Sequence, residues 1–304
     1  MTAPRTRQAG GYRDQVGPHP SPWEGEVPVL DVLLHDVGIG VFLVATVGAL
    51  VAPATMTPLL PLAWPLSLAM VGIDMLLLLV DLGDWTRFFH MFRVFKPGTP
   101  MSLGVWSLTG FLLALTGAAT WGALALVGVA PATPPAAVLG LAVLALVLAV
   151  PASIYKGAVF SITSQPGWRD ARWTAGALSA SSVLLGVAAL AVQARILDLP
   201  ATVLLWKVAP VVVLVDAALF AAWMGGARAA MVDRLPPERR VAEGLFQWGA
   251  RGAALALLLL GRPNLTAAVT LSLLVAAPAY VARRTFLALP HLPRRTSRAP
   301  VAGR

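Results

Sequence analysis

The sequence predicts an all-α integral membrane protein of eight transmembrane helices, arranged as two four-helix bundles. Its 304 residues are 58% hydrophobic and only 12% charged, with a mean hydropathy of +0.76. A soluble domain carries about twice that share of charged residues, so the composition excludes a soluble globular enzyme and, equally, a disordered chain. Apolar stretches long enough to cross a hydrocarbon core of ~30 Å recur along the chain.

Residues 1–30 are polar and contain several Pro and Gly but no apolar segment, so we expect a tail and not a signal peptide. Lipid offers backbone groups no hydrogen-bond partner, and the apolar stretches that follow are too long and too uniformly apolar for barrel strands, so we expect helices. The predicted spans are 31–53, 59–82, 101–128, 135–161, 173–196, 200–227, 242–262 and 264–285.

The seventh span is the least apolar, because Arg251 interrupts it. A re-entrant segment at this point would move the C-terminus to the other side of the membrane. The spans predict four regions: a polar tail (1–30), a first bundle (31–161), a second bundle (162–285) and a basic C-terminal tail (286–304).

The basic residues are distributed asymmetrically. Of the 23 Lys and Arg residues, eighteen lie in the second, fourth and sixth connections or in the terminal segments, with Arg283 and Arg284 at the end of the last span counted in the C-terminal segment. Only Arg195 and Arg262 lie in the other connections. Because cytoplasmic loops carry an excess of positive charge, we expect both termini to lie in the cytoplasm and the chain to reside in the inner membrane. The basic residues lack the interleaved aromatics of a nucleic-acid interface, so we expect no nucleic-acid partner.

Cysteine is absent from the chain. The protein therefore has no disulfide, no iron–sulfur cluster on its own thiolates and no cysteine nucleophile. Haem in a helical bundle normally needs two histidines at membrane depth, whereas only His35 of the four histidines falls in a predicted span. We expect neither haem nor any other metal, and the usual phosphate-loop, dinucleotide and hydrolase motifs are also missing.

Ionisable residues inside the predicted spans are few. Each costs ~2.5–3.5 kcal/mol at membrane depth and therefore needs a partner, a water-filled cavity or a function. His35, Asp74, Asp81 and Tyr155 fall in the same half of the membrane, because the second and fourth spans return to the side where the first begins. An imidazole, a carboxylate and a phenol can bond the two oxygens of a quinone and move protons, so His35, Asp74 and Tyr155 are the candidate catalytic and quinone-binding residues.

The other polar residues in or near the spans can be explained by structural roles as well as by catalytic ones. Asp81 and Arg87 are as well explained by a helix-end cap and a loop salt bridge as by a role in catalysis. We expect Asp36 to lie at the membrane interface. Lys207 and Asp216 are nine residues apart and cannot pair on one helix face, so each needs its own partner, unless both belong to a proton path through the second bundle.

Two segments carry a family resemblance. The first contains Asp81-Leu82-Gly83, then Arg87, then Thr99-Pro100-Met101-Ser102-Leu103-Gly104, and it resembles the second and third helices of the polysulfide reductase membrane-subunit family (NrfD/PsrC type). The second contains Tyr155-Lys156-Gly157, a loop with Trp168 and a helix rich in small residues. It resembles the family's Tyr-Thr-Gly helix end, with Lys156 in place of a small or hydroxyl residue.

The resemblance covers nearly all of residues 31–285 and implies a subunit that binds menaquinone or ubiquinone in its first bundle, at positions matching His35, Asp74 and Tyr155. It implies electron exchange with an iron–sulfur subunit and, through that subunit, with a molybdopterin or multihaem catalytic subunit, so the chain would not be catalytic alone. In several family members the quinone site and this partner lie on the extracytoplasmic side, whereas the charge distribution places the site near the cytoplasm.

We therefore expect a quinone-reactive membrane anchor of a respiratory oxidoreductase complex, with Asp81 and Arg87 fixing the loop over the site. One alternative is a proton-coupled solute or ion transporter that uses Asp74, Lys207 and Asp216. The chain shows no inverted repeat of the kind that many transporters carry. A second alternative is a structural anchor without quinone chemistry.

Overall fold

The computed structural model describes residues 25–81, 86–93, 95–163, 165 and 167–295, with only the backbone of Asp81 and Arg87. Every regular element in these ranges is helical. Seven of the described helices are long and apolar enough to cross a membrane, so the chain is an all-α, multi-pass membrane protein.

Each predicted span contains a helix. In chain order the elements are α1 (Glu26–Val51), α2 (Pro53–Met56), η2 (Thr57–Leu59), α3 (Leu60–Asp81), α4 (Thr86–His90), α5 (Pro100–Leu126), α6 (Ala136–Ser161), α7 (Thr174–Ile196), α8 (Ala201–Arg234), α9 (Pro237–Leu260), α10 (Leu265–Ala288) and η3 (Leu289–His291).

The largest differences from the predicted ends are at α1, α8 and α9. The first helix begins at Glu26, inside the segment expected to be a polar tail, because Glu26 finds a partner within the fold: Arg284 Nε donates to its carboxylate at 2.9 Å. The connection between α8 and α9 is correspondingly short, since α8 runs to Arg234 and α9 starts at Pro237.

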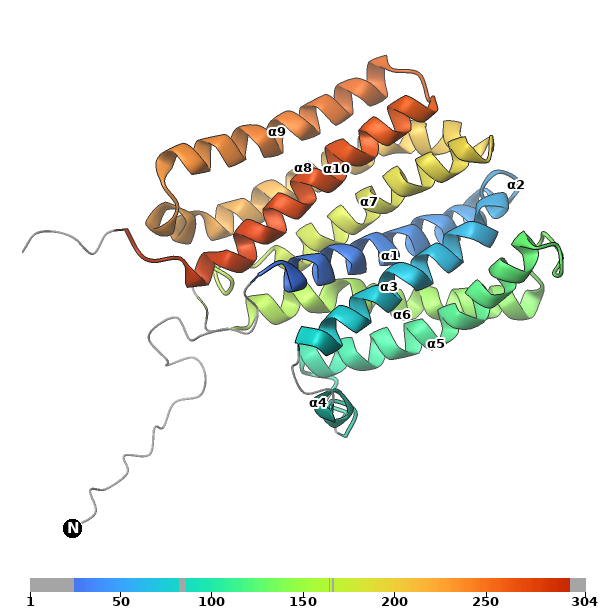
Figure 1. The fold of residues 1–304 in the computed structure, drawn as a ribbon, viewed down its shortest axis with the longest axis horizontal. Helices are drawn as coiled ribbons and strands as arrows, with labels where there is room; N and C mark the ends of the chain where they lie inside the picture. The colour runs from blue at the N-terminus through green and yellow to red at the C-terminus, as the bar shows by residue number, and fades with distance from the viewer. Residues whose placement is uncertain (1–24, 82–85, 94, 164, 166, 296–304) are drawn as a thin grey trace, which may run out of the picture.

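The long helices lie side by side, with α1 in the middle (Figure 1). On one side α1 packs against α3 and α6, and α5 packs against both of these. On the other side α1 packs against α7 and α10, α7 packs against α8, and α9 packs against α8 and α10. The start of α1 and the end of α10 therefore lie at the same end of the molecule (Figure 1), where Glu26 and Arg284 pair.

The crossing of α1 and α7 brings two backbones into contact. A Cβ atom on Gly40 would lie 1.8 Å from the carbonyl oxygen of Ser182, and one on Gly186 would lie 2.2 Å from the carbonyl carbon of Gly40. Small residues permit such close approach between membrane helices, where packing rather than the hydrophobic effect holds helices together. This contact fixes α1 against the α7–α10 side of the molecule.

α9 is a single helix that continues through Arg251 without a break. It is not among the seven helices of clear membrane-spanning composition, because its first half carries Arg and Glu residues. Its second half is apolar, with Ala254 and Leu258 buried and Leu259 and Leu260 exposed. Similar outward-facing side chains on other helices, such as Leu113 and Val80, give the molecule an apolar surface suited to lipid contact.

Candidate functional site

Three helices bring a group of ionisable side chains together in the interior. Asp31 and His35 lie one turn apart on α1, Asp74 projects from α3 and Lys156 from α6, and each of the four is at most 6% exposed. Charged groups at this depth are costly unless they neutralise one another, so their convergence needs a chemical explanation.

Close packing of α1 on α3 holds Asp74 against His35. A Cβ atom on Gly38 would lie 2.5 Å from Val71 Cγ2, and the carbonyl of Gly38 accepts a hydrogen bond of 2.7 Å from Ser67 Oγ. Gly38 is close to one turn after His35 on α1, and Val71 is close to one turn before Asp74 on α3. The two helices are thus in contact next to the ionisable group.

Both ring nitrogens of His35 are engaged. Nε2 lies 2.9 Å from the carbonyl oxygen of Ala152 and Nδ1 lies 2.9 Å from Asp74 Oδ2. A carbonyl oxygen can only accept, so Nε2 carries a hydrogen. The contact between Nδ1 and Asp74 Oδ2 is a hydrogen bond only if a second proton lies between these two atoms. The pair therefore shares one proton, as imidazolium and carboxylate or as imidazole and carboxylic acid, and is neutral in either form.

Lys156 joins the two carboxylates. Its Nζ donates to Asp31 Oδ2 at 2.7 Å, to Asp74 Oδ1 at 2.6 Å and to the backbone carbonyl of Asp31 at 3.3 Å, which uses its three hydrogens. The positive charge of Lys156 and the negative charge of Asp31 cancel, and the His35–Asp74 pair is also neutral. The four side chains thus form a charge-neutral, hydrogen-bonded network at membrane depth.

Tyr155 lies beside this network. Its ring meets the imidazole of His35 edge to face at 5.6 Å between centroids, and a Cβ atom on Gly104 of α5 would lie 2.2 Å from its ring. The described residues supply no hydrogen-bond partner for its hydroxyl group. The absence of a side chain at position 104 therefore leaves room for a phenol whose polar end is available to a ligand.

A cavity of about 90 Å³ opens next to Tyr155, at the end of the molecule where α1 begins. Asp31, Tyr155 and Lys156 supply most of its polar wall. The rest is almost entirely apolar and comes from α3, α4, α5 and α6 and the residue after α4: Met75, Leu78, Phe88, Met91, Met101, Val105, Leu108, Val159 and Phe160, with Thr109. An apolar cavity with a few converging polar groups is the usual form of a small-molecule site.

One polar atom in this cavity wall is unsatisfied. Asp31 Oδ1 is buried and has no hydrogen-bond partner among the described residues, whereas Asp31 Oδ2 is held by Lys156. A buried acceptor without a partner costs about 1–3 kcal/mol, which a ligand hydroxyl could recover. Asp31 and Tyr155, two residues of the cavity wall, thus each keep a polar group without a hydrogen-bond partner among the described residues.

The structure brings together three of the residues singled out from the sequence, His35, Asp74 and Tyr155. The side chains of Asp81 and Arg87 lie outside the described residues. Asp216 is buried and accepts from Arg251 Nε at 2.9 Å, whereas Lys207 is exposed near the start of α8. Lys207 therefore does not lie in the interior with Asp216 and Arg251.

The expectation for Asp36 is wrong. Asp36 is 1% exposed, not interfacial, because Arg283 of α10 bonds its carboxylate through both Nε and Nη2. Ser181 Oγ also accepts from Arg283. Arg283 therefore belongs to the interior and not to the basic surface at the C-terminal end, although it was counted there.

Sequence reasoning missed Asp31, and it placed Lys156 inside the fourth span, as a departure from a family pattern, without assigning it to the site. The spacing of Asp31 and His35, four residues apart and so on one helix face, was a usable signal. Among the described residues, no three His, Asp or Glu side chains gather as metal ligands. No protein-family model matches the chain, and no curated protein matches it.

Proposed function

We propose that the protein is a quinone-reactive membrane subunit of a respiratory oxidoreductase complex. The observation that carries this proposal is the cavity beside Tyr155, which is apolar except where it meets a proton-holding network. A quinol is a flat apolar ring with two hydroxyl groups. It can donate to Asp31 Oδ1 and bond the hydroxyl of Tyr155, while its ring lies among the apolar side chains.

Quinone chemistry, with menaquinone or ubiquinone, couples the transfer of two electrons to that of two protons. The residues of this chain supply the proton part. In quinol oxidation Asp31 Oδ1 would accept one proton, and Lys156 would transmit the charge change to the His35–Asp74 pair. The second proton would pass to water, and both electrons would leave to the partner subunit. Both ring nitrogens of His35 already have hydrogen-bond partners within the chain. His35 would therefore not contact the quinone and would act on it only through Tyr155 and Asp31.

The full architecture proposed is eight spans in two four-helix bundles, with α9 as the eighth span. In support, α9 packs along α8 and α10, and its Arg251 is neutralised inside the bundle by Asp216. The guanidinium of Arg251 also lies 3.9 Å from the ring centre of Phe220. An eighth span also agrees with the start of α1 and the end of α10 lying at one end of the molecule (Figure 1).

The proposed partners follow from the likeness to the polysulfide reductase membrane-subunit family. This chain has no cysteine and no metal-binding group among its described residues, so electrons would pass to an iron–sulfur subunit docked at the membrane surface. A molybdopterin or multihaem subunit would complete the complex. The distribution of Lys and Arg supports cytoplasmic termini in the inner membrane.

Electron transfer from a short-chain quinol in membranes that contain the assembled complex tests the proposal. Asp31→Asn and Tyr155→Phe should each reduce the rate by about tenfold or more, because each removes a group that contacts the quinol. Asp170→Asn and Tyr280→Phe are matched controls outside the cavity and should leave the rate unchanged. Normal rates in assembled Asp31→Asn and Tyr155→Phe complexes would contradict the proposal.

Two further measurements distinguish the alternative functions. Proton-coupled uptake of a solute by proteoliposomes that contain the purified chain alone would favour a transporter. Assembly of a complex that neither binds quinol nor responds to Asp31→Asn would favour a structural anchor.

A further inference from the structure

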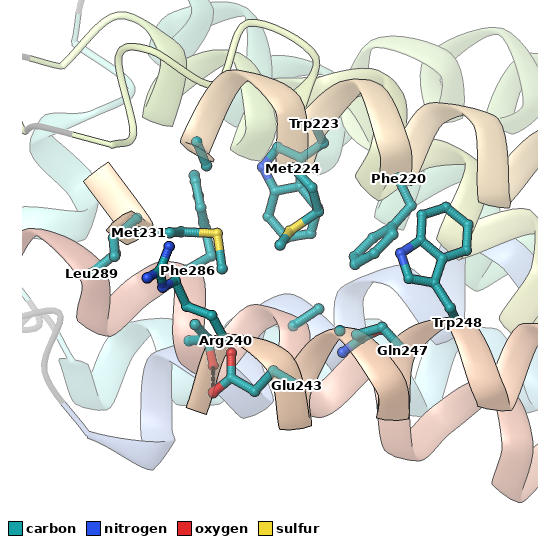
Figure 2. Close-up of a pocket in the computed structure, with 14 residues that line it drawn as sticks. Phe220, Trp223, Met224, Met231, Arg240, Glu243, Gln247, Trp248, Phe286 and Leu289 are labelled. Atoms are coloured by element: carbon teal, nitrogen blue, oxygen red, sulfur yellow. Dashed lines mark hydrogen bonds between the residues drawn. The ribbon is translucent and has the colours of Figure 1, made fainter. Parts of the chain in front are cut away.

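A second cavity, of about 80 Å³, lies between α8, α9 and α10 near the connection of α8 to α9 (Figure 2). Its wall is aromatic, with Phe220 and Trp223 from α8, Trp248 from α9 and Phe286 from α10. Arg240 of α9 contributes a cation to the same wall. The network around His35 has no residue in this cavity, so it is a separate site.

Two hydrogen-bond donors in this cavity lack acceptors. Trp223 is 3% exposed, and its indole N–H has no partner among the described residues. Arg240 Nε is also buried without a partner, and no carboxylate in the described part of the chain pairs with its guanidinium. A buried donor without an acceptor is destabilising, so a ligand with acceptor oxygens would be stabilised here.

Neighbouring polar side chains do not supply those acceptors, because they are already committed. Glu243 Oε1 accepts from Arg239 Nε at 2.8 Å and from Thr285 Oγ1 at 3.0 Å. The side-chain oxygen of Gln247 accepts from Arg251 Nη1 at 2.9 Å. The two free donors are left to bond a molecule from outside the chain.

The order of residues along the cavity indicates the shape of that molecule. Figure 2 shows Leu289, Met231 and Arg240 at one end, Trp223 in the middle, and Phe220 with Trp248 at the other end. Arg240 is near the start of α9, so in the proposed eight-span architecture the cationic end faces the membrane surface and the aromatic end lies deeper. The matching ligand has an anionic head, an acceptor oxygen below it and an apolar chain.

We propose that this cavity binds one anionic phospholipid. Its phosphate bonds the guanidinium of Arg240, an ester carbonyl accepts from the indole N–H of Trp223, and an acyl chain lies along the aromatic wall formed by Phe220 and Trp248, whose rings contact each other. Basic pockets between membrane helices bind anionic headgroups in this way, and guanidinium–phosphate hydrogen bonds are among the stronger ones. A quinone has two neutral carbonyls and no charge to match Arg240.

Native mass spectrometry of the full chain in detergent tests this site, with phosphatidylglycerol as the probe. We expect one retained phosphatidylglycerol per chain and no comparable retention of phosphatidylcholine. Arg240→Gln should weaken retention by about tenfold, the effect of one charge-assisted hydrogen bond. Trp223→Phe keeps an aromatic ring but removes the N–H, and should weaken retention severalfold.

Arg228→Gln is the matched control, because Arg228 has the same charge on α8 but is exposed and outside the cavity. Thermal unfolding identifies any variant that fails to fold. Equal loss of phosphatidylglycerol in Arg240→Gln and Arg228→Gln would show a diffuse electrostatic attraction and overturn the site. Retention of phosphatidylcholine at the same level, or displacement of phosphatidylglycerol by a short-chain quinol, would also overturn it.

Discussion

Lys156 Nζ lies 2.6 Å from Asp74 Oδ1, and this contact ties α6 to α3 across the interior of the molecule. The same ammonium group bonds Asp31 on α1. One lysine thus connects three helices and neutralises carboxylates that would otherwise be isolated from water.

Replacing Lys156 with methionine should destabilise the protein strongly. Breaking a buried ion pair leaves an uncompensated charge, and the expected loss is about 3–5 kcal/mol in the free energy of unfolding. Thermal unfolding in detergent measures the change. Lys207→Met removes an exposed lysine and should change stability by no more than about 0.5 kcal/mol. The double variant with Asp31→Asn should recover part of the loss, and an equal effect at both lysines would contradict the role of Lys156.

Gly104→Ala should impair the cavity beside Tyr155. The new methyl group would lie 2.2 Å from the Tyr155 ring, so the phenol must move and the affinity for a short-chain quinol should fall several-fold. Quenching of tryptophan fluorescence by the quinol reports binding. On α3, the same substitution at Gly72 meets no atom within 4 Å and serves as the control. Unchanged affinity in Gly104→Ala would contradict a role for the position of Tyr155 in quinol binding.

The crossing of α1 and α7 should not tolerate a side chain. Gly40→Ala places a methyl group 1.8 Å from a backbone oxygen, which cannot rotate away as a side chain can. The loss of stability should reach or exceed the upper end of the 1–3 kcal/mol range typical of overpacking. Gly252→Ala on α9 is the control, because its methyl group meets nothing within 4 Å. Similar unfolding temperatures for the two variants would refute the close backbone contact.

The topology of α9 can be measured with introduced cysteines, since the natural chain has none. We expect Glu238→Cys, at the start of α9, and Arg262→Cys, after its end, to react with a membrane-impermeant maleimide from opposite sides of the membrane. Labelling of both from the same side would exclude α9 as a span. Proteoliposomes opened with detergent confirm that each cysteine is reactive.

The helices could be predicted from the sequence because each apolar run is a local feature. Every predicted span contains a helix, although α1 begins earlier than expected because Glu26 finds its partner, Arg284, far along the chain. Of the candidate site, His35, Asp74 and Tyr155 could be grouped by depth alone. Asp31 shares a face of α1 with His35 and could have been added by that spacing, whereas Lys156 could not be assigned to the site, because helix depth does not specify which faces of α1, α3 and α6 point toward one another.

The sequence by itself determined that this is a helical membrane protein with no cysteine among its residues and with a few ionisable residues inside its apolar spans. Composition and hydropathy are sufficient for this prediction, since every segment that crosses lipid must be apolar and must satisfy its own backbone hydrogen bonds. Only the tertiary structure decided how those residues pair: Lys156 with Asp31 and Asp74, Arg283 with Asp36, and Arg251 with Asp216. The pairings depend on contacts between helices distant in sequence, and a buried charge takes as partner whichever opposite charge the packing places beside it.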